Sequence, residues 1–195
     1  MPQEKDWQVT LYDWLETISV SDVTLPDKTI SWDGTLSDTD EMADLWLQLQ
    51  EVTVTQVVNS EPDWYVLDAG NGKGIEATGN VRIYHEPNWD SEHRSWSNEP
   101  AFLYQLSVPQ QDGTEGNPYK GNPALGKRAL VVGMVDMIMY MSGGDYADNT
   151  DMHGKALLSW AETYRWTKDL LPPEVKSAYE EGMERSLDLI IEMGA

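Results

Sequence analysis

Histidine is the side chain best suited to proton transfer near neutral pH, because its unperturbed pKa lies between about 5 and 8. The chain has three histidines, His85, His93 and His153, and none has the HExxH spacing or any other spacing typical of a metal site. His153 falls on the same predicted helix face as Leu157 and Trp160. This position is typical of a histidine at a helix start that satisfies local polar groups, but His153 is also the best general acid or base of the three. Both interpretations stay open.

Aromatic residues gather between residues 89 and 104, where rings could stack on sugars and amides could bind hydroxyl groups. Trp89 and Trp96 lie in a polar segment that we expect to be a surface loop. The residues that follow, SNEPAFLY, place Asn98 at a helix start and Tyr104 within that helix. Helix capping by Asn98 and ordinary core packing explain this segment equally well. Tyr119, in the segment NPYKGNP, is first interpreted as part of a turn.

Two further segments could bind ligands. The segment DYADNTD crowds Asp145, Asp148 and Asp151, and calcium takes oxygen ligands from such loops. It lacks the central glycine and final glutamate of an EF-hand, so we expect a solvated loop, with a weak divalent-cation site as the alternative and no other cofactor. The segment GKGIEA (72–77) is like a dinucleotide fingerprint, but a strand-like NVRIY follows where a helix is required. We therefore expect a glycine-rich loop there.

Composition limits the partners of the chain. Its 195 residues include 13 Lys and Arg against 34 Asp and Glu, which gives a net charge of -21. Nucleic acids and anionic membranes are disfavoured, because neutralising phosphates requires clustered cations. The absence of cysteine excludes disulfides and thiol catalysis. The apolar run Ala129–Met141 is shorter than the ~20 residues that span a bilayer, and no signal peptide is visible at the N-terminus.

The spacing of apolar residues predicts a mainly α fold with a small β element. Three long helices are expected at about 123–142, 152–170 and 173–193, and a shorter one over 99–106. Trp7, Leu11, Trp14 and Leu15 predict one short amphipathic turn. We expect a mixed α/β cap over residues 1–95 and a helical array over 96–195. The cap would hold a helix at 39–50 and strands at 52–58, 64–67 and 80–84.

The order of these elements resembles a known enzyme architecture. WSNEPAFLYQL is followed by NPYKGNPALGKRALVVGMVDMIMY, and then by a helix with a histidine at its start and ETYRW in its middle. This succession, over residues 96–195, is similar to the opening of the (α/α) toroid of bacterial polysaccharide lyases of the alginate-lyase and heparinase-like kind. Related toroids include glycoside hydrolases. A full toroid needs more helices, so we expect a partial array, which leaves open whether this chain is active by itself.

The resemblance implies β-elimination on a uronate-containing polysaccharide, in an extracellular or periplasmic location. It assigns Asn98 to neutralise the uronate carboxylate, His153 to act as base or neutraliser, Tyr164 to donate a proton and Arg165 to anchor the substrate. Trp89, Trp96, Tyr104 and Tyr119 would bind sugar. Stabilised charge and a proton acceptor within reach are what such a reaction needs. The alternative is a non-catalytic helical domain that binds carbohydrate or protein. The oligomeric state is not indicated.

Overall fold

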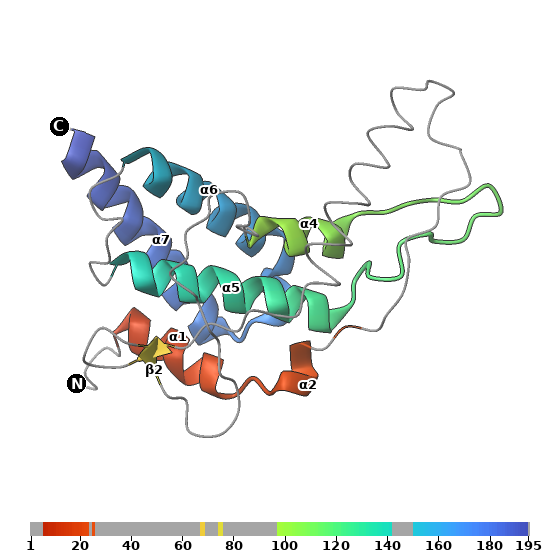
Figure 1. Ribbon diagram of the computed structural model, residues 1–195, viewed down its shortest axis with the longest axis horizontal. Helices are drawn as coiled ribbons and strands as arrows, with labels where there is room; N and C mark the ends of the chain where they lie inside the picture. The colour runs from red at the N-terminus through yellow and green to blue at the C-terminus, as the bar shows by residue number, and fades with distance from the viewer. Residues whose placement is uncertain are drawn as a thin grey trace.

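The computed structural model describes residues 6–23, 25, 67–68, 74–75, 97–141 and 150–194, and this part of the chain is mainly α-helical. Six α-helices pack together within it (Figure 1). They are α1 (Trp7–Glu16), α2 (Val20–Val23), α4 (Asn98–Gln105), α5 (Pro123–Met141), α6 (Thr150–Thr167) and α7 (Pro173–Gly194). A 3₁₀ helix, η2 (Lys168–Leu170), joins α6 to α7. Among these helices none is long and apolar enough to cross a bilayer.

The long helices lie close to their predicted positions. The structure confirms the helices predicted at 123–142 and 173–193, and it splits the one predicted at 152–170 into α6 and η2. The short helix expected over 99–106 is α4. The first amphipathic segment forms a helix of 10 residues rather than one turn, and α2 was not predicted.

The β element is small in the described residues. β1 (Leu67–Asp68) pairs antiparallel with β2 (Gly74–Ile75), with Leu67 opposite Ile75. Only the last residue of the strand predicted at 64–67 is described, and it begins β1. The glycine-rich segment 72–77, expected to be a loop, supplies β2. The helix predicted at 39–50 and the strands predicted at 52–58 and 80–84 lie outside the described residues.

Local signals explain where the helices begin. The Asp6 side chain accepts a hydrogen bond from the backbone N–H of Gln8 at 3.1 Å and caps α1. Asn122 caps α5 in the same way, since its Oδ1 accepts from the N–H of Ala124 at 3.0 Å. Both α5 and α7 have proline at their first position, where the missing N–H costs nothing.

α5 is the central helix of the bundle. It contacts α6, α4, α2, α7 and α1 (Figure 1). Most of its side chains are buried. This burial on nearly all sides agrees with its continuous apolar run. The charged residue in that run, Asp136, is itself buried. The main core that surrounds α5 combines one face of each long helix with the apolar face of α1, and includes Leu11, Trp14, Leu130, Met134, Ile138, Trp160, Val175 and Tyr179.

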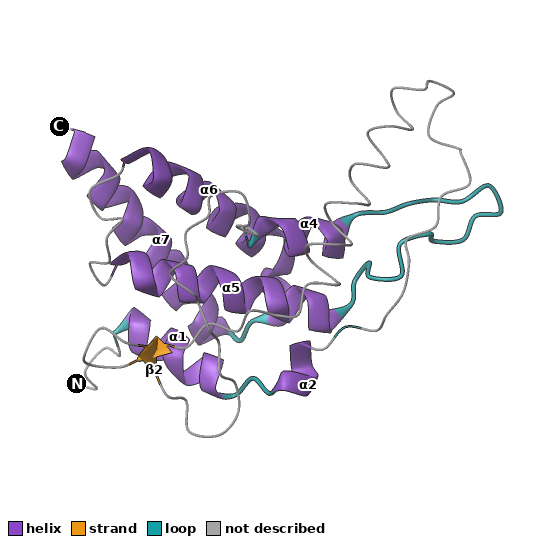
Figure 2. Cartoon of the chain, in the orientation of Figure 1, coloured by secondary structure: helices purple, strands orange, loops and turns teal. Residues whose placement is uncertain are grey.

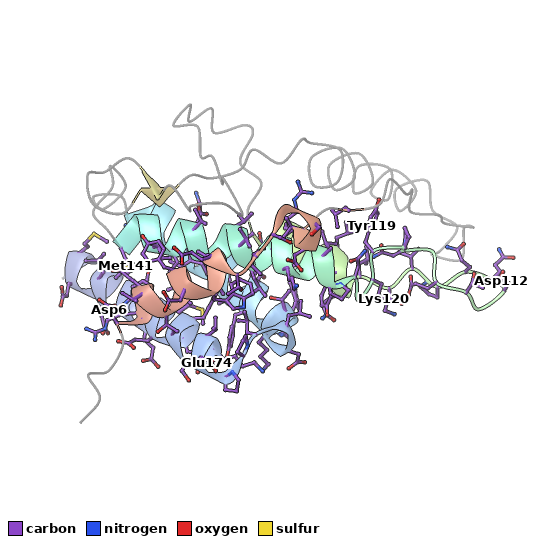
Figure 3. The ribbon with its side chains drawn as sticks, turned by 90° about the horizontal axis from the view of Figure 1, so that it is seen from below. Asp6, Asp112, Tyr119, Lys120, Met141 and Glu174 are labelled. Atoms are coloured by element: carbon purple, nitrogen blue, oxygen red, sulfur yellow. The ribbon has the colours of Figure 1, made fainter. Side chains whose placement is uncertain are left out.

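A hairpin-shaped loop between α4 and α5 extends away from the helices (Figure 2). Its two sides meet at an isolated bridge between Pro109 and Glu115, and Gly113 at its tip has φ +82°, a conformation that favours glycine. Figure 3 shows Asp112 at the far end of this hairpin. The Asn117 side chain fixes its base, because Nδ2 donates to the carbonyl oxygens of Leu103 and Leu106, both at 2.8 Å.

Glu115 holds the two sides of the hairpin together and should respond to acid. Burial raises its pKa, but hydrogen bonds from the N–H groups of Val108 and Asn117 and from the Ser107 and Lys120 side chains outweigh this and lower it from 4.5 to about 2. The ionised group therefore stabilises the hairpin fully above pH 4.5, and this stabilisation is lost as the pH falls toward 2. We expect the amide proton shifts of Val108 and Asn117 to titrate together with a midpoint near 2 in NMR spectra. A midpoint near 4.5 would contradict this account.

Candidate functional site

A strip of polar and aromatic side chains runs along the seam between α4 and α6. We call it the α4–α6 strip, and it consists of Asn98, Phe102, Gln105, Glu162 and Trp166. The three α4 residues follow one another at i, i+4 and i+7, and the two α6 residues at i and i+4. Each set therefore shares one face of its helix. All five side chains are half-buried or exposed, so the strip is open to solvent along its length.

Hydrogen bonds order one end of the strip. Asn98 Nδ2 donates to Glu162 Oε2 at 2.6 Å, while Asn98 Oδ1 accepts from Ser159 Oγ at 3.2 Å. Both polar atoms of the amide are therefore engaged, and the Glu162 carboxylate is held in one orientation. A short charge-assisted hydrogen bond of this kind is among the stronger ones in proteins.

The other end of the strip is aromatic. The rings of Phe102 and Trp166 lie 5.9 Å apart between centroids with an interplanar angle of 57°, which is a favourable tilted arrangement. Gln105 Nε2 donates to the backbone oxygen of Trp166 at 2.7 Å and ties the end of α4 to α6. Phe102 remains 37% exposed although its ring packs against Trp166.

Three buried hydroxyl groups support the strip from below. Ser97 Oγ lies 3.0 Å from Ser159 Oγ, and Thr163 Oγ1 donates to Ser97 Oγ at 2.9 Å. Gly133 on α5 faces this cluster, since a Cβ there would lie 3.3 Å from Ser97 Oγ. These contacts fix α4 against α6 and α5, so the strip is built on rigid elements.

Tyr164 lies on a different side of α6. Its hydroxyl donates to Glu180 on α7, and its ring stacks on Tyr179 with centroids 5.3 Å apart. Burial and then the Glu180 carboxylate raise the pKa of Tyr164 to about 12. The hydroxyl is therefore protonated at neutral pH, and it is a weaker acid than an ordinary tyrosine. Tyr164 is two positions from Glu162, and residues at this spacing do not face each other on a helix.

The structure does not bring the predicted catalytic residues into one place. Asn98 is in the α4–α6 strip, Tyr164 faces α7, and Arg165 is exposed on α6. His153 is fully buried on α6. Of the predicted sugar-binding residues, Tyr119 is fully buried in a second core with Leu103, Val108 and Leu125, and Tyr104 packs against that core. Trp89 and Trp96 lie outside the described residues.

Sequence reasoning missed four of the five residues of the strip: Phe102, Gln105, Glu162 and Trp166. A signal for them was present, because 98/102/105 and 162/166 each repeat at helical spacing with a mixed amide, carboxylate and aromatic character. What no spacing shows is that these two faces meet. Asn98 and Glu162 are 64 positions apart in the chain.

Metal ligation finds no support in the described ranges, where no three His, Cys, Asp or Glu side chains are grouped so that they could hold an ion. For the predicted weak cation site, Asp145 and Asp148 lie outside these ranges. Of Asp151 only the backbone, in the first turn of α6, is described.

Comparisons with protein-family models, with curated proteins and with solved structures found no match to this chain.

Proposed function

We propose that this chain is a helical segment of a carbohydrate-active enzyme and that the α4–α6 strip binds part of its polysaccharide substrate. The observation that carries the proposal is the exposed Phe102 ring, packed against the half-buried Trp166 ring, beside the ordered Asn98–Glu162 pair. Aromatic rings offer an apolar surface to the C–H face of a sugar, and amides and carboxylates bind its hydroxyl groups. The rigid support beneath the strip lowers the entropic cost of binding.

The reaction that we propose for the enzyme is β-elimination on a uronate-containing polysaccharide, as the resemblance to (α/α) toroid lyases implies. The succession of α5, α6 and α7 as packed neighbours is the arrangement that such an array needs. Tyr164 is the proposed proton donor, since its hydroxyl is protonated at neutral pH, although its raised pKa makes it a weaker acid than an ordinary tyrosine. Asn98 and Tyr164 contact different sides of α6, so the role that we assign to this chain is substrate binding before catalysis. An extracellular or periplasmic location belongs to the same proposal.

Phe102→Ala tests the proposed sugar contact. We expect a panel of oligosaccharides to include one that binds the chain saturably in calorimetry. Phe102→Ala should then weaken this binding at least tenfold, about 1.4 kcal/mol, because the exposed ring supplies stacking area that alanine lacks. Trp166→Phe keeps a ring and should retain binding, but it should reduce the change in tryptophan fluorescence that accompanies binding.

Ile191→Ala is the matched control for Phe102→Ala. Ile191 is 60% exposed near the end of α7 and takes no part in the strip, so its truncation should leave the affinity unchanged. The absence of saturable binding across neutral and uronate oligosaccharides would refute the proposed function. Equal losses in Phe102→Ala and Ile191→Ala would show that binding occurs elsewhere on the molecule.

A further inference from the structure

We propose that the sugar residue on the α4–α6 strip is a neutral one, and that Glu162 selects it by accepting two of its hydroxyl groups. This inference rests on the proposed function and goes beyond it. The resemblance implies a polymer that contains uronate, whereas the strip itself would take a residue that carries no carboxylate. A polysaccharide that alternates neutral and acidic residues satisfies both.

The first reason is the hydrogen-bonding state of Glu162. Its Oε2 atom accepts from Asn98 Nδ2, and its Oε1 atom has no hydrogen-bond partner among the residues that the structure describes. An ionised carboxylate is an acceptor with room for about four hydrogen bonds. A carboxylate that is held still, half-buried and only partly used is well prepared to accept hydroxyl groups from a ligand.

The second reason is the charge around the strip. Glu162 is the only ionisable residue among its five members, and the chain as a whole carries a net charge of -21. A uronate carboxylate placed beside Glu162 would bring two like charges together, which opposes binding. Neutral hydroxyl groups meet no such penalty and can donate to the carboxylate.

Glu162→Gln in the full chain tests the inference. Neutral tetrasaccharides of glucose, mannose, galactose or xylose and a tetrauronate serve as the probes in calorimetry. We expect at least one neutral probe to bind more tightly than the tetrauronate. We also expect Glu162→Gln to weaken its binding at least tenfold, because an amide accepts fewer hydroxyl donors than a carboxylate. Glu184→Gln, an exposed change on α7, should leave neutral binding unchanged.

The outcomes separate this inference from the proposed function. Tighter binding of the tetrauronate than of every neutral probe would overturn the inference and leave carbohydrate binding in place. The inference would also be overturned if Glu162→Gln bound the neutral oligosaccharide as tightly as the parent chain does. Failure of all probes to bind would overturn the proposed function as well. Circular dichroism of each variant, compared with the parent chain, shows that a lost affinity does not come from lost folding.

Discussion

Trp160→Ala is expected to lower the free energy of unfolding by about 3–5 kcal/mol. Trp160 is fully buried in the main core, and it has the largest of the fully buried side chains. Its truncation removes apolar contacts and leaves a cavity that the packed helices cannot fill. Chemical denaturation followed by circular dichroism measures the change, because the described part of the chain is mainly helical.

Leu158→Ala is the matched control on the same helix. Leu158 is 60% exposed, so its truncation removes little buried apolar area and leaves no cavity. We expect a change within about 0.5 kcal/mol. If Leu158→Ala destabilised the chain as much as Trp160→Ala, the orientation of α6 in the bundle would have to be different.

Gly133→Ala is expected to destabilise the bundle by about 1–3 kcal/mol, although alanine is the better helix former. An added Cβ on α5 would lie 2.7 Å from the Tyr179 hydroxyl and 3.3 Å from Ser97 Oγ. The Tyr179 ring is rigid and fully buried, and its hydroxyl donates to the Trp160 carbonyl at 3.2 Å, so it cannot move aside cheaply. Thermal or chemical denaturation measures the loss.

Two further variants separate steric crowding from helix propensity. Gly154→Ala on α6 adds a Cβ that meets nothing within 4 Å, so we expect it to stabilise the chain by up to about 1 kcal/mol. Tyr179→Phe removes the hydroxyl that Gly133→Ala would crowd, so Gly133→Ala should cost less in the Tyr179→Phe background than alone. If the two costs were simply additive, the proposed clash would be absent.

The helices were predictable because their signals are local. Pro123 and Pro173 begin α5 and α7, and the apolar residues of each helix repeat at helical spacing. The continuous apolar run of α5 indicated burial on most sides, which its central position confirms. η2 was not predicted as a separate element. A 3₁₀ turn at the end of an α-helix changes the hydrogen bonding but leaves the residue pattern almost the same.

The candidate site was less predictable because it depends on tertiary contacts. Asn98 was equally consistent with a helix cap and with a binding residue, and the structure shows it bonded to Ser159 and Glu162 across the seam. Tyr119 lies in a turn, as its sequence indicated, yet its ring fills the second core. A residue pattern describes one element at a time, and it does not say which face of α4 meets which face of α6.

The contact between α1 and α7 has a consequence for the synthesis of the chain. Trp7 packs close to Gly182, where an added Cβ would lie 2.9 Å from the indole ring. These residues lie near opposite ends of the sequence, so the ribosome makes α1 roughly ten to thirty seconds before α7 at typical elongation rates. During that interval α1 lacks its contact with α7, so the packing of α1 is completed only after α7 has been made.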